Sequence, residues 1–377
     1  MTPSKHQFAG KCKRVKLSDI CVKGKSSLRQ KDIANDGPYA VYGASGIVGS
    51  TSCFQNAKPY VAVVKDGAGV GRANACNAET SVLGTMQALI PKEGVDCRYL
   101  LHLVRSMRLG EDFSGSTIPH IYFRDYGKTL VPFPDMSGQR QIVEALDDIE
   151  KQRLTATKQI DRLDSLVKSR FVEMFGDFAC YETKPLIKCV DCIEAGKSPK
   201  CLAFSRKMAE PGVLKLSAIS SGVYCENENK ALPRSVSLTI DKVVHANDIL
   251  LSRKNTPELV GRSVLVKHTD GNIMFPDIIF RMHPLSPINA MYLSYLLAGP
   301  LLHSIQSLAH GSAKSMSNIP KSELAKLSIP IPALNLQNEF ANFASQVDKS
   351  RFGGMLHLLN SLSGIMHASF FSVADTD

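Results

Sequence analysis

Apolar residues between Gln139 and Phe175 recur at steps of three and four, the spacing of one face of a helix. The segment contains neither proline nor glycine, whereas Pro132 and Pro134 precede it and Gly176 follows it. Such residues are typical start and stop signals of a helix. The pattern predicts one helix over 139–175, which at 1.5 Å per residue would be about 55 Å long. An apolar seam sustained over this length is typical of a coiled coil.

A weaker copy of the same stripe runs from residue 336 to about residue 372, with Gly353 and Gly354 in its middle. A long helix with an apolar seam must bury that seam, so the two helices are expected to pair antiparallel in a coiled coil. The alternative is that each helix docks on its own module. The candidate pairing residues are Ile142, Leu146, Ile149, Ile160, Leu163, Val167, Phe340, Val347, Leu358 and Ile365.

The chain contains an internal repeat. Residues 15–26 match residues 187–198, both ending in Gly-Lys-Ser. A second match joins Pro132-Phe-Pro134 and Gln139 to Pro330-Ile-Pro332 and Gln337. Two copies of one module in one chain predict an object with pseudo-twofold symmetry.

Each copy reads as a mixture of strands and helices. An apolar run at 60–64 predicts a strand followed by a glycine-rich turn, and 248–251 predicts its counterpart. Residues 99–103 and 292–296 match and look helical. The expected fold class is α+β, with two mixed α/β domains separated by two long antiparallel helices. The expected segments are 1–137, 138–176, 177–333 and 334–377.

The net charge of +10 is unevenly distributed, with +7 on residues 1–137 and +5 on 176–333. Residues 138–175 carry no net charge and 334–377 carry −2. Basic modules with neutral or acidic connectors suggest a polyanion held at two places, although charge alone is equally compatible with no such partner. Ten cysteines without a regular framework favour reduced thiols. No leader and no membrane span are expected, and the expected location is the cytoplasm.

Three catalytic or ligand-binding patterns are incomplete. Gly24-Lys-Ser26 and its repeat resemble the end of a P-loop, but an aspartate occupies the place of the required earlier glycine. Cys189 and Cys192 have zinc-ligand spacing, yet they align with Leu17 and Ile20 in the first copy, which predicts core positions. No constellation of paired carboxylates or of Ser, His and Asp stands out, so neither a metal nor a catalytic centre is expected.

The order of several short motifs, repeated twice, carries a family resemblance. The carriers are Lys16-Leu-Ser-Asp-Ile20, Gly115-Ser-Thr117, Gly311-Ser-Ala313, Val131-Pro-Phe-Pro134 with Gln139, Ile329-Pro-Ile-Pro332 with Gln337, and the helix end from Ser169 to Asp177. In these the chain resembles the specificity subunit of type I restriction–modification enzymes. The likeness extends over essentially the whole sequence.

The resemblance implies two target recognition domains, at 1–137 and 177–333, each reading one half of a split, asymmetric site on double-stranded DNA. The two helices would set the gap and dock two modification subunits, which methylate adenine, and restriction subunits would join them. The chain itself would be no enzyme and hold no cofactor, with S-adenosylmethionine, ATP and Mg bound by the partners. Alternatives are the specificity partner of a type IIB-like enzyme, a self-contained methyltransferase or nuclease, or a coiled-coil scaffold that binds no DNA.

The candidate DNA-binding residues are polar or basic and lie on predicted turns beside strands or helix ends. Lys and Arg would contact phosphates and fix the register, while a few side chains would reach base edges. In the first domain they are Lys25, Lys65, Arg72, Ser116, Thr117 and His120. In the second they are Lys197, Arg253, Lys254, Asn255, Arg262, Lys314 and Ser315.

Overall fold

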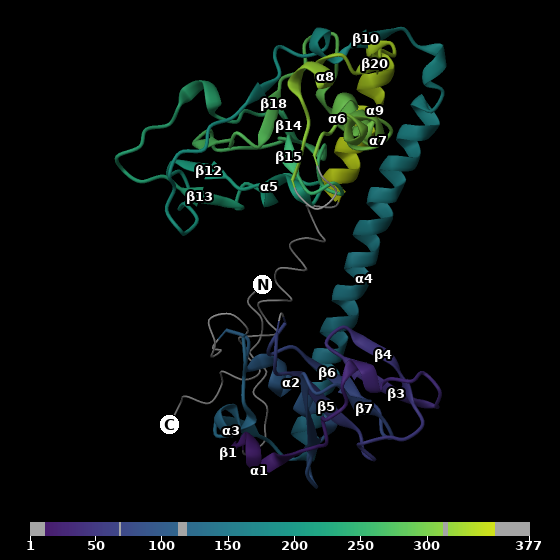
Figure 1. Ribbon diagram of the computed structural model, residues 1–377, viewed down its shortest axis with the longest axis vertical. Coiled ribbons are helices and arrows are strands. Elements are labelled where there is room, and N and C mark those ends of the chain that lie inside the picture. The colour runs from purple at the N-terminus through teal and green to yellow at the C-terminus, as the bar shows by residue number, and fades with distance from the viewer. Residues whose placement is uncertain (1–11, 68, 112–118, 312–315, 351–377) are drawn as a thin grey trace. The chain divides into compact units, whose positions relative to one another are not determined.

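The computed structural model describes residues 12–67, 69–111, 119–311 and 316–350 (Figure 1). Among these, residues up to Lys158 form one compact unit and residues from Gln159 form a second. The boundary falls inside helix α4 (Met136–Phe175), which therefore belongs to both units. The four segments expected from the sequence divide the chain by role, and that division stays a prediction.

The first unit contains two sheets and a separate pair of strands. The four-stranded sheet has the order β2-β8-β5-β6 and is antiparallel throughout. The three-stranded sheet has the order β4-β3-β7, with β3 and β7 parallel. Strands β1 and β9 form the pair. The strands are β1 (Lys13–Lys16), β2 (Cys21–Lys23), β3 (Tyr39–Gly43), β4 (Gly46–Thr51), β5 (Tyr60–Val64), β6 (Ala73–Cys76), β7 (Ser81–Val82), β8 (Met86–Pro91) and β9 (Leu130–Phe133). The helices before α4 are α1 (Leu17–Ile20), η1 (Gln30–Asp32), α2 (Cys97–Ser106) and α3 (Phe123–Tyr126).

The second unit repeats this topology. Its sheets have the orders β11-β18-β14-β16 and β13-β12-β17, with β12 and β17 parallel, and β10 pairs with β20. The strands are β10 (Thr183–Pro185), β11 (Glu194–Ala195), β12 (Gly212–Leu214), β13 (Asn229–Ala231), β14 (Ile249–Ser252), β15 (Lys254–Asn255), β16 (Ser263–Leu265), β17 (Ile273–Met274), β18 (Ile279–Met282), β19 (Ser317–Asn318) and β20 (Ser328–Pro330). The helices are η2 (Phe178–Cys180), η3 (Leu186–Lys188), α5 (Ser217–Ser220), η4 (Ile240–Lys242), α6 (Ala290–Ala298), α7 (Leu302–Ser307), α8 (Lys321–Ala325) and α9 (Leu334–Ser350). The predicted internal repeat and the α+β fold class are confirmed.

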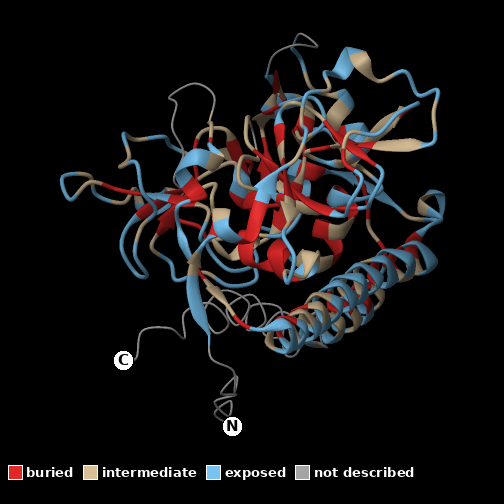
Figure 2. Cartoon of the chain, turned by 90° about the horizontal axis from the view of Figure 1, so that it is seen from below, coloured by how far each residue is buried: buried red, intermediate tan, exposed pale blue. Residues whose placement is uncertain are grey.

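Strands β5 and β14 are inner strands of the two larger sheets, and we call them the central strands. Every residue of both is buried, which explains the uninterrupted apolar runs in their sequences. Buried residues, red in Figure 2, gather inside the fold. Successive side chains of a strand point to opposite faces. Accordingly, Val61 and Val63 pack with helix α2, whereas Ala62 packs with residues of the other face. In β14, Ile249 packs with α6 and Leu250 packs on the opposite side. The predicted strands at 60–64 and 248–251 are therefore confirmed to within a residue.

A buried glutamine joins the long helix of each copy to the rest of its unit. The Gln139 side chain is fully buried, accepts from the backbone N–H of Asp96 (2.8 Å) and donates to the carbonyl of Pro134 (3.0 Å). Gln337 accepts from the N–H of Asn289 (2.9 Å) and donates to the carbonyl of Pro332 (2.8 Å) in the same way. Asp96 and Asn289 cap α2 and α6. We call these contacts the glutamine clasp; they explain why the Pro-x-Pro and Gln motif is repeated.

Helix α4 confirms the predicted long helix but begins at Met136 rather than residue 139. The reason is a cap: the carboxylate of Asp135 accepts from the N–H of Gly138 (2.8 Å), so the glycine lies in the first turn. The helix ends at Phe175, just before Gly176, as predicted. Helix α9 begins at Leu334, and its predicted continuation, including Leu358 and Ile365, lies outside the described residues.

The first part of the α4 seam docks on its own unit. Ile142 and Leu146 are buried in one cluster with Tyr99 and Leu103 of α2, and Ile149 packs at its edge. Among the described residues these contacts correspond to the alternative left open by the sequence, docking on the helix's own module. The physical reason is that α2 presents an apolar side which α4 covers.

The last part of the α4 seam contacts α9 within the second unit. Val167 and Phe171 lie in one cluster with Phe340, and the rings of Phe171 and Phe340 are 5.1 Å apart. Arg170 pairs with Glu339 across the two helices (3.3 Å). Of the other candidate pairing residues, Val347 packs at the edge of this cluster, while Ile160 and Leu163 are half-buried.

Candidate nucleic-acid interface

The turn that follows strand β5 or β14 is closed by an equivalent backbone hydrogen bond in both units. The N–H of Val64 donates to the carbonyl of Arg72, and the N–H of Ser252 donates to the carbonyl of Arg262, each at 2.8 Å. The residue before each arginine is a glycine with positive φ, 84° and 78°. These bonds make Val64 equivalent to Ser252 and Arg72 equivalent to Arg262.

The same comparison aligns a second basic position. The N–H of Lys65 donates to the carbonyl of Thr85 (3.0 Å), and the N–H of Arg253 donates to the carbonyl of Ile278 (2.9 Å). The repeated Gly-Lys-Ser motif supplies a third. The basic positions shared by the two units are therefore Lys25 with Lys197, Lys65 with Arg253, and Arg72 with Arg262.

In the Gly-Lys-Ser motif, the glycine and the serine have structural roles. A Cβ on Gly24 would lie 2.5 Å from Oδ1 of Asn56, and a Cβ on Gly196 would overlap the carbonyl oxygen of Phe275. Ser26 Oγ accepts from the N–H of Ala88 (2.9 Å), and Ser198 Oγ accepts from the N–H of Asp277 (3.2 Å). The exposed lysine between them, Lys25 or Lys197, is the group left to meet a ligand.

The shared arginines differ in how firmly they are held. Arg72 is exposed, and its Nε donates to the carbonyl of Gly69 (3.4 Å). Arg253 is half-buried, lies 5.3 Å over the Phe280 ring and donates to a backbone carbonyl. Arg262 donates to the carbonyl of Ser220 (3.1 Å). The two arginines of the second unit are therefore more buried than Arg72.

One candidate is unsuited to its predicted role. Asn255 is only 6% exposed, its amide donates to Ser252 Oγ (3.3 Å) and its oxygen accepts from the N–H of Thr256 (2.9 Å). An asparagine that is this deeply buried and bonded inside the fold offers almost no accessible surface to a base edge. The candidates Ser116, Thr117, Lys314 and Ser315 lie outside the described residues.

His120 forms part of a group that the sequence analysis did not anticipate. Its Nδ1 lies 2.7 Å from Asp66 Oδ1, and its ring stacks on Tyr122 with centroids 6.4 Å apart. The guanidinium of Arg124 lies 4.8 Å from the centre of the Tyr122 ring. The only sign of this group in the sequence was the run of aromatic and basic residues Tyr122-Phe-Arg124.

A second unanticipated group surrounds Arg72. Arg72 lines a hollow of about 440 Å³ together with Arg105 of α2 and Arg108, which follows α2. Glu111 also lines it and pairs with Arg108 at 3.4 Å. Arginines suit phosphate because their planar guanidinium donates two parallel hydrogen bonds.

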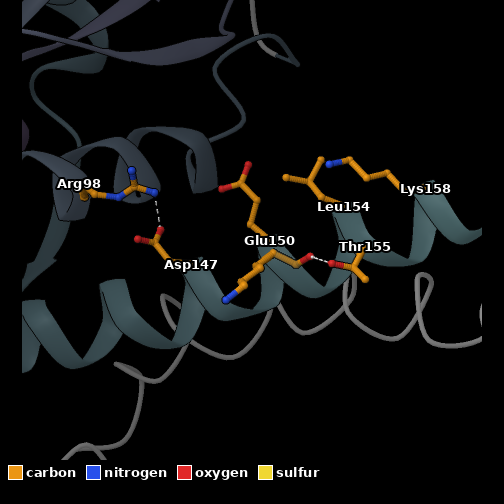
Figure 3. A pocket seen from close by; sticks show the side chains of 7 residues that line it. Arg98, Asp147, Glu150, Leu154, Thr155 and Lys158 are labelled. Carbon is orange, nitrogen blue, oxygen red and sulfur yellow. Dashed lines mark hydrogen bonds and ion pairs between the residues drawn. The ribbon is translucent and has the colours of Figure 1, made fainter.

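Three potential metal ligands come together between α2 and α4, namely His102, Asp147 and Glu150, whose ligand atoms lie within 4.8 Å of one another. Arginines already hold both carboxylates: Arg98 contacts Asp147 at 2.6 Å (Figure 3), and Arg105 contacts Glu150 at 3.4 Å. Burial raises the pKa of Asp147, but hydrogen bonds from Arg98 and His102 outweigh this and leave it below its usual value. We call this ion-paired group the polar latch of α2 and α4.

The cysteines fit the prediction of core positions in part. Cys189 is buried in the main cluster of the second unit, as Leu17 is in the first, whereas Cys192 is half-buried. No cysteine belongs to the metal-ligand group just described. No helix in the described part of the chain is both long and apolar enough to cross a bilayer.

A known protein is similar to this chain in sequence, and two solved structures are similar to it in fold. The curated type I restriction enzyme EcoEI specificity subunit of Escherichia coli is 35% identical over 148 residues, which cover 38% of this chain. The chain spans about a quarter of that relative's length, because the match covers 25% of it.

Two solved structures share the fold. The type I restriction–modification S subunit from M. genitalium has a TM-score of 0.53 at 14% identity, covering 97% of this chain and 98% of its own. A chain from a study of complex assembly and conformational transition of the type I R-M system has a TM-score of 0.50 at 16% identity, covering 96% and 97%. Residues 10–164 match the family described as the type I restriction modification DNA specificity domain. The expected resemblance is confirmed by this match and by the curated relative, both of which show what a part of this chain is similar to.

Proposed function

We propose that the chain is the DNA specificity subunit of a type I restriction–modification complex. In this role it recognises a two-part, asymmetric site on double-stranded DNA, with one half read by each unit. It also docks two methyltransferase subunits, and through them restriction subunits. The chain acts in the cytoplasm as a recognition subunit and catalyses no reaction itself.

The observation that carries this proposal is a duplicated scaffold with a cation at the same three places in each copy. Phosphate contacts position a protein on DNA without reading its sequence, so equivalent cations are suited to that task. The surrounding residues differ between the copies, as expected of two readers with different targets. A repeated reader fits a site made of two parts.

The proposed chemistry belongs to the partners. S-adenosylmethionine would be bound by the modification subunits, and ATP and Mg by the restriction subunits. Within the described residues, the cluster with metal-ligand geometry is the polar latch, whose carboxylates are paired with arginines. We propose that the chain binds no cofactor of its own.

The test of DNA binding is the salt dependence of affinity for random-sequence duplexes. Each phosphate contact neutralised by Lys or Arg adds about −0.9 to the slope of log K against log salt. We expect a steep slope, measured by fluorescence anisotropy of labelled duplex with the full chain. A flat response would reject the proposal.

A triple substitution locates the contacts. Replacing Lys25, Lys65 and Arg72 by Met should weaken binding to every sequence and reduce the slope by up to about 3. The matched control replaces three exposed lysines of the same unit, Lys31, Lys58 and Lys128, and removes the same charge. Equal losses in both triples would mean that affinity follows net charge rather than these positions.

A further inference from the structure

We propose that one position of the repeated scaffold, Asp66 in the first unit and Lys254 in the second, selects a base in each half-site. The opposite charges at this position make the two half-sites different. The inference rests on the proposed DNA-binding function and names the residues that confer its specificity.

The equivalence of the two residues comes from three backbone contacts. The N–H of Asp66 donates to the carbonyl of Thr85 (3.3 Å), and the N–H of Lys254 donates to the carbonyl of Ile278 (3.2 Å). Each residue immediately follows a shared cation, Lys65 or Arg253.

The second contact is a strand bridge across the turn, and the third is a hydrogen bond from the residue after the bridge partner. Asp66 bridges to His120, and Lys254 pairs with Asn318. The residue after each partner, Ile121 or Ile319, donates its N–H to the carbonyl of the shared cation at 3.0 Å. These backbone contacts are therefore common to both units, whereas the side chains at this position differ.

A position that differs in charge on a common frame is suited to telling two half-sites apart. The phosphate contacts proposed for the shared cations next to it cannot do so, because phosphates are alike in every sequence. A carboxylate beside a polyanion also lowers affinity by repulsion. Such a carboxylate is compatible with tight binding where it meets a hydrogen-bond donor of a base.

The side chains of Asp66 and Lys254 have the hydrogen-bonding groups that recognition of a base requires. The carboxylate of Asp66 is 30% exposed, and His120 holds one of its oxygens at 2.7 Å. A carboxylate offers about four lone-pair sites, so this bond uses only part of its capacity. In the major groove a carboxylate accepts from the N4 amino group of cytosine, whereas lysine donates to O6 and N7 of guanine. We therefore expect cytosine to be read by Asp66 and guanine by Lys254.

The experiment is selection of bound duplexes from a random library by the full chain, followed by sequencing. The variants are Asp66→Asn and Lys254→Met. Asp66→Asn should lose its preference for cytosine at one position of one half-site, by roughly 5- to 150-fold. Lys254→Met should lose a guanine in the other half-site by a similar factor. Matched controls with the same charge changes are Asp36→Asn and Lys188→Met, at exposed positions outside the turns.

The exchange variant Asp66→Lys with His120→Asn places the second unit's pair on the first unit's frame. It should introduce a guanine preference into the half-site that Asp66 reads. If Asp66 served only to orient His120, the exchange would abolish the preference without creating a new one, which would overturn the inference. This variant also decides the matter if Asp66→Asn does not fold, as checked by circular dichroism.

The outcomes separate the two proposals. If the unaltered chain selects no common sequence, the proposed function itself is wrong. If it selects a two-part sequence that both single variants leave unchanged, the function stands and the inference is wrong. A change of both half-sites by either single variant would also overturn it.

Discussion

The two units use one fold but pack their long helices with different chemistry. In the first, His102 of α2 meets Asp147 of α4 at 2.9 Å, in a group of ion pairs. In the second, the equivalent residue of α6 is Tyr295, whose ring packs edge-on against Phe340 with centroids 5.1 Å apart. Each residue lies three positions after a tyrosine that donates to a proline carbonyl, Tyr99 or Tyr292. The shared fold thus places a helix–helix contact at the same position in both units, while the residues that make it are polar in one unit and aromatic in the other.

The features that both units share are the hydrogen bonds that join the elements of each unit to one another. The glutamine clasp, the capped helix and the tyrosine bond recur, with nearly equal distances. The features that change lie on the helix faces and on the turn after the central strand. Repetition therefore marks structural residues, whereas residues that differ at equivalent positions are, under the proposed function, the candidates for giving each unit its own DNA target.

The largest expected effect comes from the aromatic contact of the second unit. Phe171→Ala should reduce the free energy of unfolding by about 3–5 kcal/mol, because it empties a buried ring position. The control is its exposed neighbour, Val172→Ala, which should change it by less than about 0.5 kcal/mol. Urea denaturation followed by circular dichroism measures both. Equal losses of stability in Phe171→Ala and Val172→Ala would show that the buried aromatic ring does not stabilise this unit.

The glutamine clasp should matter equally in both units. Gln139→Ala and Gln337→Ala each leave a buried backbone N–H and carbonyl unpaired, at a cost of about 1–3 kcal/mol. The exposed Gln141→Ala is the control in the same helix. Urea titrations of the three variants test this, and a neutral result for one clasp alone would contradict the structural equivalence.

The polar latch predicts a pH dependence specific to the first unit. The folded pKa of Asp147 lies below its usual value, so its ionised form is favoured by folding. Its contribution to stability is present above the unfolded pKa, near 3.8, and is lost as the pH falls through the folded value. Asp147→Asn should lower stability at neutral pH and make it less dependent on pH in that acidic range.

Thermal unfolding at a series of pH values measures the effect of Asp147→Asn. The exposed neighbour Asp148→Asn serves as control and should leave the profile unchanged. Identical profiles for both variants would mean that the latch does not stabilise the unit. The effect is expected to be smaller than those of the clasp, because both partners of the ion pair are partly exposed.

The smallest effect concerns reactivity rather than stability. Burial raises the pKa of Cys21 and of Cys76 to about 12, so neither forms appreciable thiolate at pH 8. Iodoacetamide should label the exposed Cys53 and Cys180 well before these two, as peptide mass spectrometry would show. Early labelling of Cys21 would mean that the core of the first unit opens readily.

The sequence identified the features that depend on local pattern. The long helix followed from apolar spacing between helix-breaking residues, and the central strands followed from uninterrupted apolar runs. The repeat identified Lys25 with Lys197 as corresponding positions, and the shared Val-Gly-Arg sequence at 70–72 and 260–262 pairs Arg72 with Arg262. It did not identify Lys65 with Arg253, because the turns that follow the strands differ in length and only the hydrogen bonds align them.

What the sequence determined by itself was the duplication, the elements and the basic character of both copies, since these depend on composition and on neighbours along the chain. Tertiary structure alone decided that Ile142 and Leu146 pack on α2, that Asn255 is buried, and that Asp66 occupies the place of Lys254. Periodicity shows that a side chain must be buried without showing against what. The contacts that answer this join residues far apart in the chain, and they are set by the packing of whole elements.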